Sequence, residues 1–188
     1  MNIVLASASP RRREICDLLG IRYTVHPAAA ERAFDPALSA EDNVLATARA
    51  KAEEVAAALG TTVPVLGADT AVILDENGGY EALGKPRDEA DAKAMLRRLA
   101  GREHRVLTGV WVCADGKADG IVSAATVRFA PMTDADIDAY VATKDPMDKA
   151  GSYGIQGPCA RHIDGIDGDF YTVMGLPAAA LWRFLKNF

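Results

Sequence analysis

The sequence has few cysteines, few aromatic residues and no long apolar run. Its three cysteines, Cys16, Cys113 and Cys159, lie far apart and form no C-x-x-C pair. This spacing argues against a disulfide framework or a zinc site and fits a reducing cytoplasm. No apolar run approaches the roughly 20 residues of a membrane-spanning helix, and the first residues carry no secretory signal. We therefore expect a cytoplasmic protein that does not enter a membrane.

The short motifs that mark several enzyme families are also missing. The sequence contains no G-x-x-x-x-G-K-[ST] phosphate loop, no G-x-G-x-x-G fingerprint and no G-x-S-x-G elbow. Its three histidines do not have the H-E-x-x-H spacing of a zinc protease. A phosphate site in this chain must therefore be built in another way.

The overall charge gives no support for a general nucleic-acid-binding surface. The net charge is −5, and charged residues make up 25% of the 188 residues. The basic residues are nevertheless grouped in short clusters, which favours a local cationic pocket for a small anion. With 49% hydrophobic residues and no linker, the chain is expected to form a single domain over residues 1–188.

Strand-like and helix-like segments alternate along the chain. The sequence predicts strands at 3–6, 63–74, 80–83, 104–113 and 121–129, and helices beginning at Pro10, Val44, Asp88, Thr133 and Pro177. Residues 27–43 are expected to be irregular, and residues 75–79 to form a hairpin turn. Because hairpins interrupt the alternation, we expect an α/β fold with a mixed, twisted sheet and flanking helices.

One carboxylate, Asp69, lies inside an otherwise apolar strand, Val65–Leu74. Burying an ionised carboxylate without partners costs several kcal/mol, so Asp69 must be paired, protonated or bound to a metal. A carboxylate in this position, surrounded by cations from elsewhere in the chain, is typical of a polyphosphate site.

Basic residues that suit such a site occur in three places. Three arginines, Arg11, Arg12 and Arg13, occupy the first turn of a predicted helix, where an anion would offset their unfavourable interaction with the helix dipole. Successive helical residues point about 100° apart, so we expect Arg11 and Arg12 to face the ligand and Arg13 to face solvent. Lys51 and Lys85 complete the set, although each alone also fits an ordinary solvated surface.

A polar, glycine-rich segment, Asp148–Gly157, offers charge and hydrogen-bonding groups close to a flexible backbone. The carboxamide of Gln156 has one donor and one acceptor side, which suits the edge of a pyrimidine base. A solvated connecting loop is the alternative interpretation.

Together these segments resemble the Maf family of nucleoside triphosphate pyrophosphatases along nearly the whole chain. The matching segments are Leu5–Arg12, Lys51–Ala52, Gly67–Thr70, Gly84–Pro86, His104–Val110, Asp148–Gly157 and Val173–Pro177. The resemblance implies an inosine-triphosphatase-like fold with two lobes around a central cleft, a homodimer, and no nucleic-acid polymer as partner. The Gly-Ile-Gln-Gly stretch is similar to the branch that acts on dTTP and UTP.

The resemblance also implies roles for single residues. Asp69 would be the catalytic residue, and Glu31 with Asp69 would hold a divalent metal, Mg²⁺ or Mn²⁺. The substrate-binding residues would be Ser9, Arg11, Arg12, Lys51, Thr70, Lys85 and Gln156, with Arg11, Thr70 and Gln156 setting the base preference. Family members usually have an Asp-Glu pair where this chain has Glu31-Arg32, so only Glu31 remains for the acidic role.

Two questions stay open at this point. Asp69 could accept a proton from water, or could hold metal and orient water, since nearby cations make a carboxylate a weak base. The chain could also be a non-catalytic protein that senses nucleotides or regulates cell division through the same pocket. The presence of both the carboxylate and the cations favours the interpretation as an enzyme over a non-catalytic protein. Such an enzyme would release a nucleoside monophosphate and pyrophosphate.

Overall fold

The computed structural model describes residues 1–76 and 78–188 and divides into two compact units. Unit 1 consists of residues Met1–Thr70, Leu107–Ser123 and Tyr171–Phe188, and unit 2 of Ala71–Val106 and Ala124–Phe170. Each of three long strands contributes residues to both units. These strands are β3 (Val65–Glu76), β5 (Glu103–Ala114) and β6 (Lys117–Phe129).

The strands form one mixed sheet, as predicted. Its order is β2-β1-β3-β5-β6-β7, and β4 pairs with β3. The four shorter strands are β1 (Asn2–Leu5), β2 (Arg22–Val25), β4 (Gly79–Leu83) and β7 (Ile163–Gly168). The pairs β1–β2 and β1–β3 are parallel, whereas β3–β4 and β6–β7 are antiparallel.

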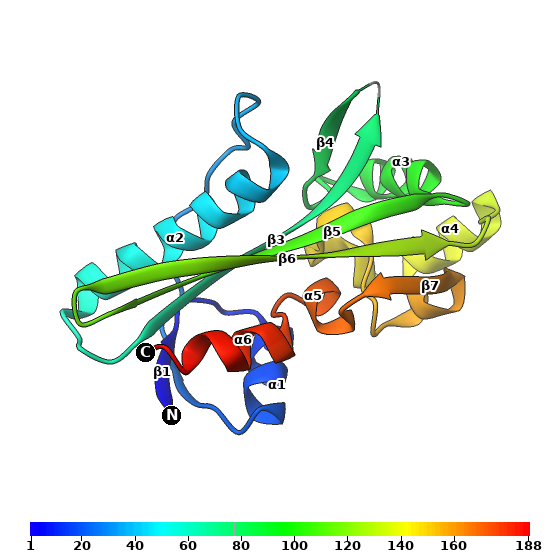
Figure 1. Ribbon diagram of the computed structural model, residues 1–188. Helices are drawn as coiled ribbons and strands as arrows, with labels where there is room; N and C mark the ends of the chain where they lie inside the picture. Colours follow the sequence, from blue (N-terminus) through cyan, green and yellow to red (C-terminus); the bar gives the residue numbers. More distant parts are fainter. Residues whose placement is uncertain (77) are drawn as a thin grey trace. The chain divides into compact units, whose positions relative to one another are not determined.

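Helices cover both faces of the strands in unit 1. Figure 1 shows α2 (Ala40–Leu59) on one side of β3, and α1 (Pro10–Leu18) and α6 (Ala178–Leu185) on the other side. The buried side chains of unit 1 include Ile3, Leu5, Leu66 and Leu181. This arrangement leaves β3 covered on both faces, which explains its nearly continuous apolar sequence.

Two glycines allow α2 to lie directly on the sheet. A Cβ atom added to Gly67 would be 2.3 Å from the carbonyl oxygen of Ala48, and one added to Gly109 would be 2.7 Å from the carbonyl oxygen of Val44. No side chain fits at either position, because the obstruction is helix backbone. The close approach brings the helix residue Lys51 within reach of the strand residue Asp69.

Unit 2 carries α3 (Glu89–Leu99) and α4 (Asp134–Ala142), and both begin where the sequence predicts, after a residue whose side chain caps the helix. Asp88 accepts a hydrogen bond from the Asp91 backbone N–H, and Thr133 with Asp136 forms a complete capping box. The remaining short helices are 3₁₀ segments at Asp145–Asp148, Ala150–Ser152 and Pro158–His162, and α5 (Phe170–Met174) joins the two units along the chain.

Some predicted boundaries were wrong. Residues 40–43 are helical, because Ser39 caps α2 one turn earlier than expected by accepting a hydrogen bond from the Asp42 N–H. Strands β2 and β7 were not predicted. Ser9 occupies the N-cap position of α1, but its side chain makes no capping bond. The predicted hairpin turn includes Asn77, which lies outside the described residues.

None of the helices within residues 1–76 and 78–188 is long and apolar enough to cross a membrane.

Candidate active site

The predicted catalytic carboxylate is paired with a lysine. Lys51 Nζ on α2 lies 2.7 Å from Asp69 Oδ1 on β3, and the two side chains are only 12% and 18% exposed. The contact explains how a carboxylate can lie in an apolar strand, since an ammonium group compensates its charge there.

Glu31 approaches the same ammonium group from the chain segment before α2. Its Oε1 lies 4.0 Å from Lys51 Nζ, and its side chain is 81% exposed. Two carboxylates thus converge on one lysine. Within the described part of the chain there is no group of three or more His, Cys, Asp or Glu side chains that would hold a metal by themselves.

Arg12 is fixed by three hydrogen bonds inside unit 1. Nε donates to the Gly175 carbonyl oxygen (3.1 Å), Nη1 to Ser7 Oγ (2.9 Å) and Nη2 to Thr70 Oγ1 (3.3 Å). A guanidinium has five N–H groups. One N–H on each terminal nitrogen therefore remains beyond these bonds, and both could donate to a ligand.

The pKa of Arg12 reports the charges near it. Burial lowers this pKa, the charge of Asp69 opposes that effect, Arg11 lowers it further and Glu31 raises it. Asp69, Arg11 and Glu31 therefore all act electrostatically on Arg12 within unit 1. Arg13 is exposed, as the helical spacing predicts.

Asp69 and Thr70 are consecutive residues of β3, so their side chains point to opposite faces of the strand. Asp69 faces α2, whereas Thr70 contacts Arg12 of α1. Gly175 adjoins this second cluster at φ +120°, and a Cβ there would lie 3.4 Å from both Arg12 Nε and Thr70 Oγ1. The glycine is needed for its backbone angle, whereas a Cβ at 3.4 Å would be in ordinary contact.

Behind Thr70 lies a row of buried hydroxyl groups. Thr70 Oγ1 is 2.9 Å from Thr108 Oγ1, and Thr108 Oγ1 donates to the Thr172 carbonyl oxygen at 2.7 Å. The Thr172 hydroxyl in turn donates to Ser123 Oγ at 2.8 Å. Thr108 and Thr172 are completely buried.

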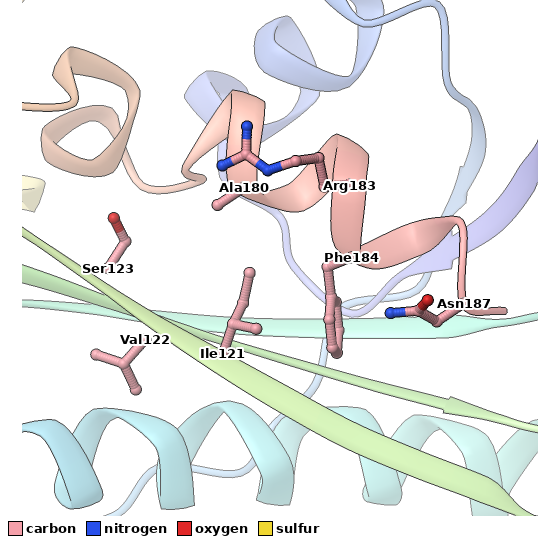
Figure 2. A pocket seen from close by; sticks show the side chains of 7 residues that line it. All are labelled: Ile121, Val122, Ser123, Ala180, Arg183, Phe184 and Asn187. Atoms are coloured by element: carbon pink, nitrogen blue, oxygen red, sulfur yellow. The ribbon is translucent and has the colours of Figure 1, made fainter.

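Ser123 also lines a groove between β6 and α6 with a volume of about 380 Å³. Figure 2 shows Ile121 and Phe184 between the strand and the helix, while Val122 points to the opposite side of β6, toward α2. The groove lining, as the structure describes it, includes none of the predicted site residues, so this groove is not the predicted triphosphate site.

In unit 2, the glycine-rich segment is joined to the turn that carries Lys85. The Gly151 N–H donates to the Gly84 carbonyl oxygen at 3.0 Å, so the backbone preceding Lys85 is tied to the segment that carries Gln156. A Cβ on Gly151 would lie 2.9 Å from Val72. Lys85 and Gln156 thus belong to neighbouring pieces of chain within this unit.

The Gln156 segment is anchored by buried polar contacts. Tyr140 donates to Asp145 Oδ2 at 2.6 Å and accepts a hydrogen bond from the Gly154 N–H at 3.1 Å. Lys149 Nζ donates to the Asp145 carbonyl oxygen at 2.6 Å and pairs with its carboxylate at 3.1 Å. Burial raises the pKa of the Tyr140 hydroxyl, so it stays protonated and able to donate.

Of the nine predicted site residues, seven belong to unit 1 and two to unit 2. Ser9, Arg11, Arg12, Glu31, Lys51, Asp69 and Thr70 lie in unit 1, and Lys85 and Gln156 in unit 2. Sequence reasoning missed Ser7, Thr108 and Gly175 as partners of Arg12 and Thr70. All three belong to the motifs that were noticed, and the serine and the threonine are polar residues in otherwise apolar strand neighbourhoods.

Known structures of low sequence identity share the fold. The Ham1 protein of Staphylococcus aureus is 14% identical, with a TM-score of 0.51 over 100% of this chain and 99% of that chain. A HAM1 protein from Coxiella burnetii is 15% identical, with a TM-score of 0.53 over the full length of both chains.

Curated relatives are much closer in sequence. The dTTP/UTP pyrophosphatase of Bacillus velezensis is 45% identical over 99% of this chain and 96% of its own, and that of Bacillus cereus strain AH820 is 43% identical over 99% and 95%. The family model described as "Maf-like protein" matches residues 2–188. Both the motifs and the near-complete match lead to the same conclusion: the chain belongs to the Maf-like protein family.

Proposed function

We propose that this protein hydrolyses nucleoside triphosphates, with dTTP and UTP preferred, to a nucleoside monophosphate and pyrophosphate. The observation that carries the proposal is the Lys51–Asp69 pair, with the charges of Arg11, Arg12 and Glu31 close by in the same unit. The name of the relatives at 43–45% identity, dTTP/UTP pyrophosphatase, supports the choice of reaction and of bases.

The cations account for triphosphate binding. A triphosphate repels a nucleophile until its negative charge is balanced. Arg12 would neutralise phosphate charge. Three hydrogen bonds hold its guanidinium in place and leave two N–H groups that could donate to phosphate oxygens. We assign the same role to Arg11, Lys51 and Lys85, the lysines acting as point charges. Ser9 would contribute a hydroxyl group at the start of α1.

Glu31 and Asp69 would hold a divalent cation, Mg²⁺ or Mn²⁺. Their oxygen atoms are the hard donors that such ions prefer, and their convergence on the Lys51 ammonium shows that a positive charge is favoured between them. Protein sites for Mg²⁺ often use only one or two carboxylates and complete the shell with phosphate and water, so this pair fits. When bound, the cation would supply further charge neutralisation at the phosphates.

Asp69 has two proposed roles, which share one consequence. It either accepts the proton of the attacking water or holds the metal and orients that water. In both roles the negative charge is essential. We also propose that the Gln156 amide group donates a hydrogen bond to a carbonyl oxygen of the base. We further propose that the protein acts as a cytoplasmic homodimer on free nucleotides; its net charge of −5 supports the exclusion of nucleic acid.

Pyrophosphate release from dTTP, UTP, CTP, GTP and 7-methyl-GTP, measured with Mg²⁺ and with Mn²⁺, tests the proposal. We expect turnover with the highest kcat/KM for dTTP and UTP. The variant Asp69→Asn should lose more than about 100-fold in kcat while its circular dichroism spectrum and melting temperature stay near those of the wild type. If none of the nucleotides is hydrolysed, the proposed enzymatic function is wrong. If 7-methyl-GTP is preferred, the proposed preference for dTTP and UTP is wrong.

A further inference from the structure

The hydrogen bonds that link the Thr172 carbonyl, Thr108, Thr70 and Arg12 all donate in one direction. At one end, the Thr172 carbonyl oxygen can only accept a hydrogen bond. At the other end, the Arg12 guanidinium can only donate. Two hydroxyl groups, those of Thr108 and Thr70, lie between these ends at 2.7, 2.9 and 3.3 Å from one partner to the next.

Each hydroxyl has a single proton, so the ends determine where both protons point. The proton of Thr108 must lie on the bond to the Thr172 carbonyl, because two oxygens 2.7 Å apart need a proton between them. Thr108 therefore accepts from Thr70, and the proton of Thr70 is committed to Thr108. Arg12 Nη2 then donates to one of the two lone pairs of Thr70.

Thr70 is only partly buried, so a ligand can reach its hydroxyl group. The hydrogen bonds already made limit what this hydroxyl can offer the ligand. Its remaining hydrogen-bonding capacity is one lone pair, so it can accept a hydrogen bond and cannot donate one. Phosphate oxygens are acceptors, and Thr70 therefore does not bind the phosphate groups of the substrate. A nucleotide offers donors on its base and on its sugar. The 2′-hydroxyl is absent from dTTP, which the name of the Bacillus velezensis relative includes beside UTP.

Resting on the proposed function, we propose that Thr108 is a positioning residue that holds the Thr70 hydroxyl as an acceptor for the N3–H of thymine or uracil. Cytosine has an unprotonated N3, which would set one lone pair against another. Thr108 thus supports discrimination between UTP and CTP without touching the substrate, since it is completely buried. Gly175 fixes the other end by holding Arg12.

The variant Thr108→Val tests this step, because valine has the shape of threonine and no hydroxyl group. The Thr70 proton then loses its acceptor and can turn toward the ligand. We expect the ratio of kcat/KM for UTP to that for CTP to fall about five- to tenfold, while kcat with saturating UTP stays within about threefold of the wild type. Thr108→Ser keeps the hydroxyl and should keep the ratio.

A matched control and a milder variant make the test decisive. Thr47→Val also removes a buried hydroxyl in unit 1, one that donates to the Asn43 carbonyl within α2, and it should leave the ratio unchanged. If Thr108→Val does not fold, Thr108→Cys, with its weaker hydrogen bonds, should lower the ratio in the same direction by a smaller factor. Equal ratios for Thr108→Cys and Thr108→Ser would then overturn the proposal.

A sugar analogue separates the base from the 3′-hydroxyl. If Thr108→Val changes the ratio of UTP to 3′-deoxy-UTP and leaves the ratio of UTP to CTP unchanged, Thr70 accepts from the sugar and the proposal is wrong. If the wild type prefers UTP and Thr108→Val has the same UTP-to-CTP ratio, the role of Thr108 is refuted and the proposed function is not affected. Absence of turnover in the wild type refutes the proposed function instead.

Discussion

Lys51 donates a 2.7 Å hydrogen bond to Asp69 in a place where both side chains are largely shielded from water. Charges in such surroundings interact more strongly than on the surface, and removing one partner leaves the other uncompensated. The pair therefore links stability to activity, because the same lysine balances the carboxylate in the free protein and would balance phosphate in the complex.

Replacing Lys51 by methionine should weaken both properties. We expect the free energy of unfolding at pH 7 to fall by about 3 kcal/mol, since Asp69 is left charged and unpaired, and kcat/KM for dTTP to fall at least about tenfold. Urea denaturation and pyrophosphate release measure the two effects.

Lys93→Met is the matched control, because Lys93 forms an ion pair of the same length with Asp138, whose side chain is 57% exposed. An exposed pair contributes about 1 kcal/mol or less. Equal losses of stability in the two variants would show that burial of the Lys51 pair has no energetic consequence.

Gly67→Ala should separate α2 from β3. The added Cβ would lie 2.3 Å from the Ala48 carbonyl oxygen and 2.6 Å from the Ala52 nitrogen, so helix or strand must move. We expect a loss of about 3 kcal/mol, or a melting temperature about 6–12 °C lower, together with reduced activity because Lys51 moves away from Asp69.

The corresponding change at Gly79, where the nearest atom would be 3.9 Å away, should shift the melting temperature far less. A Gly67→Ala protein with wild-type melting temperature and activity would contradict the close packing of helix and sheet.

Tyr140→Phe tests whether the anchored segment in unit 2 takes part in base recognition. The change removes the donor to Asp145 and the acceptor for the Gly154 N–H. We expect a loss of stability of about 1–3 kcal/mol from these unsatisfied groups. If Gln156 reads the base, its displaced segment should also lower the preference for UTP over CTP. A less stable protein with an unchanged preference would restrict Tyr140 to a structural role.

Individual residues show how far the sequence could predict this structure. A charge partner for Asp69 could be predicted because a carboxylate in an apolar strand requires one. The exposure of Arg13 could be predicted because three successive helical residues cannot all face one ligand. The start of α2 was missed although Ser39-x-x-Asp42 is a capping signal. Strand β7 could not be predicted, because its sequence Ile-Asp-Gly-Ile-Asp-Gly is poor in strand-forming residues and depends on pairing with β6.

The hydroxyl row was hidden for a different reason. Thr108 lies 38 residues from Thr70 and 64 from Thr172, and threonine is common in strands for packing reasons alone. These residues become partners only because β3 and β5 are adjacent strands and because the chain passes beside them again at Thr172. Such a contact depends on the topology of the fold, and local sequence patterns do not predict it.

His104 makes stability depend on acid pH. It is buried in unit 2, where Nε2 lies 2.7 Å from the Tyr153 hydroxyl and its ring packs edge-on against Phe129. Burial lowers the pKa of His104 from 6.5 to about 4. Because the unfolded chain then binds a proton more readily than the folded one, His104 destabilises the fold as the pH drops below 6.5 and has its full effect below about 4.

Between pH 7 and pH 5 this difference should cost about 2 kcal/mol in the free energy of unfolding. His104→Gln cannot gain a proton in this range and still offers a side-chain partner to Tyr153. We expect the variant to be less stable than the wild type at pH 7 but to lose about 2 kcal/mol less on going to pH 5. Urea denaturation of both proteins at the two pH values measures the difference, and parallel losses would show that His104 does not titrate as a buried group.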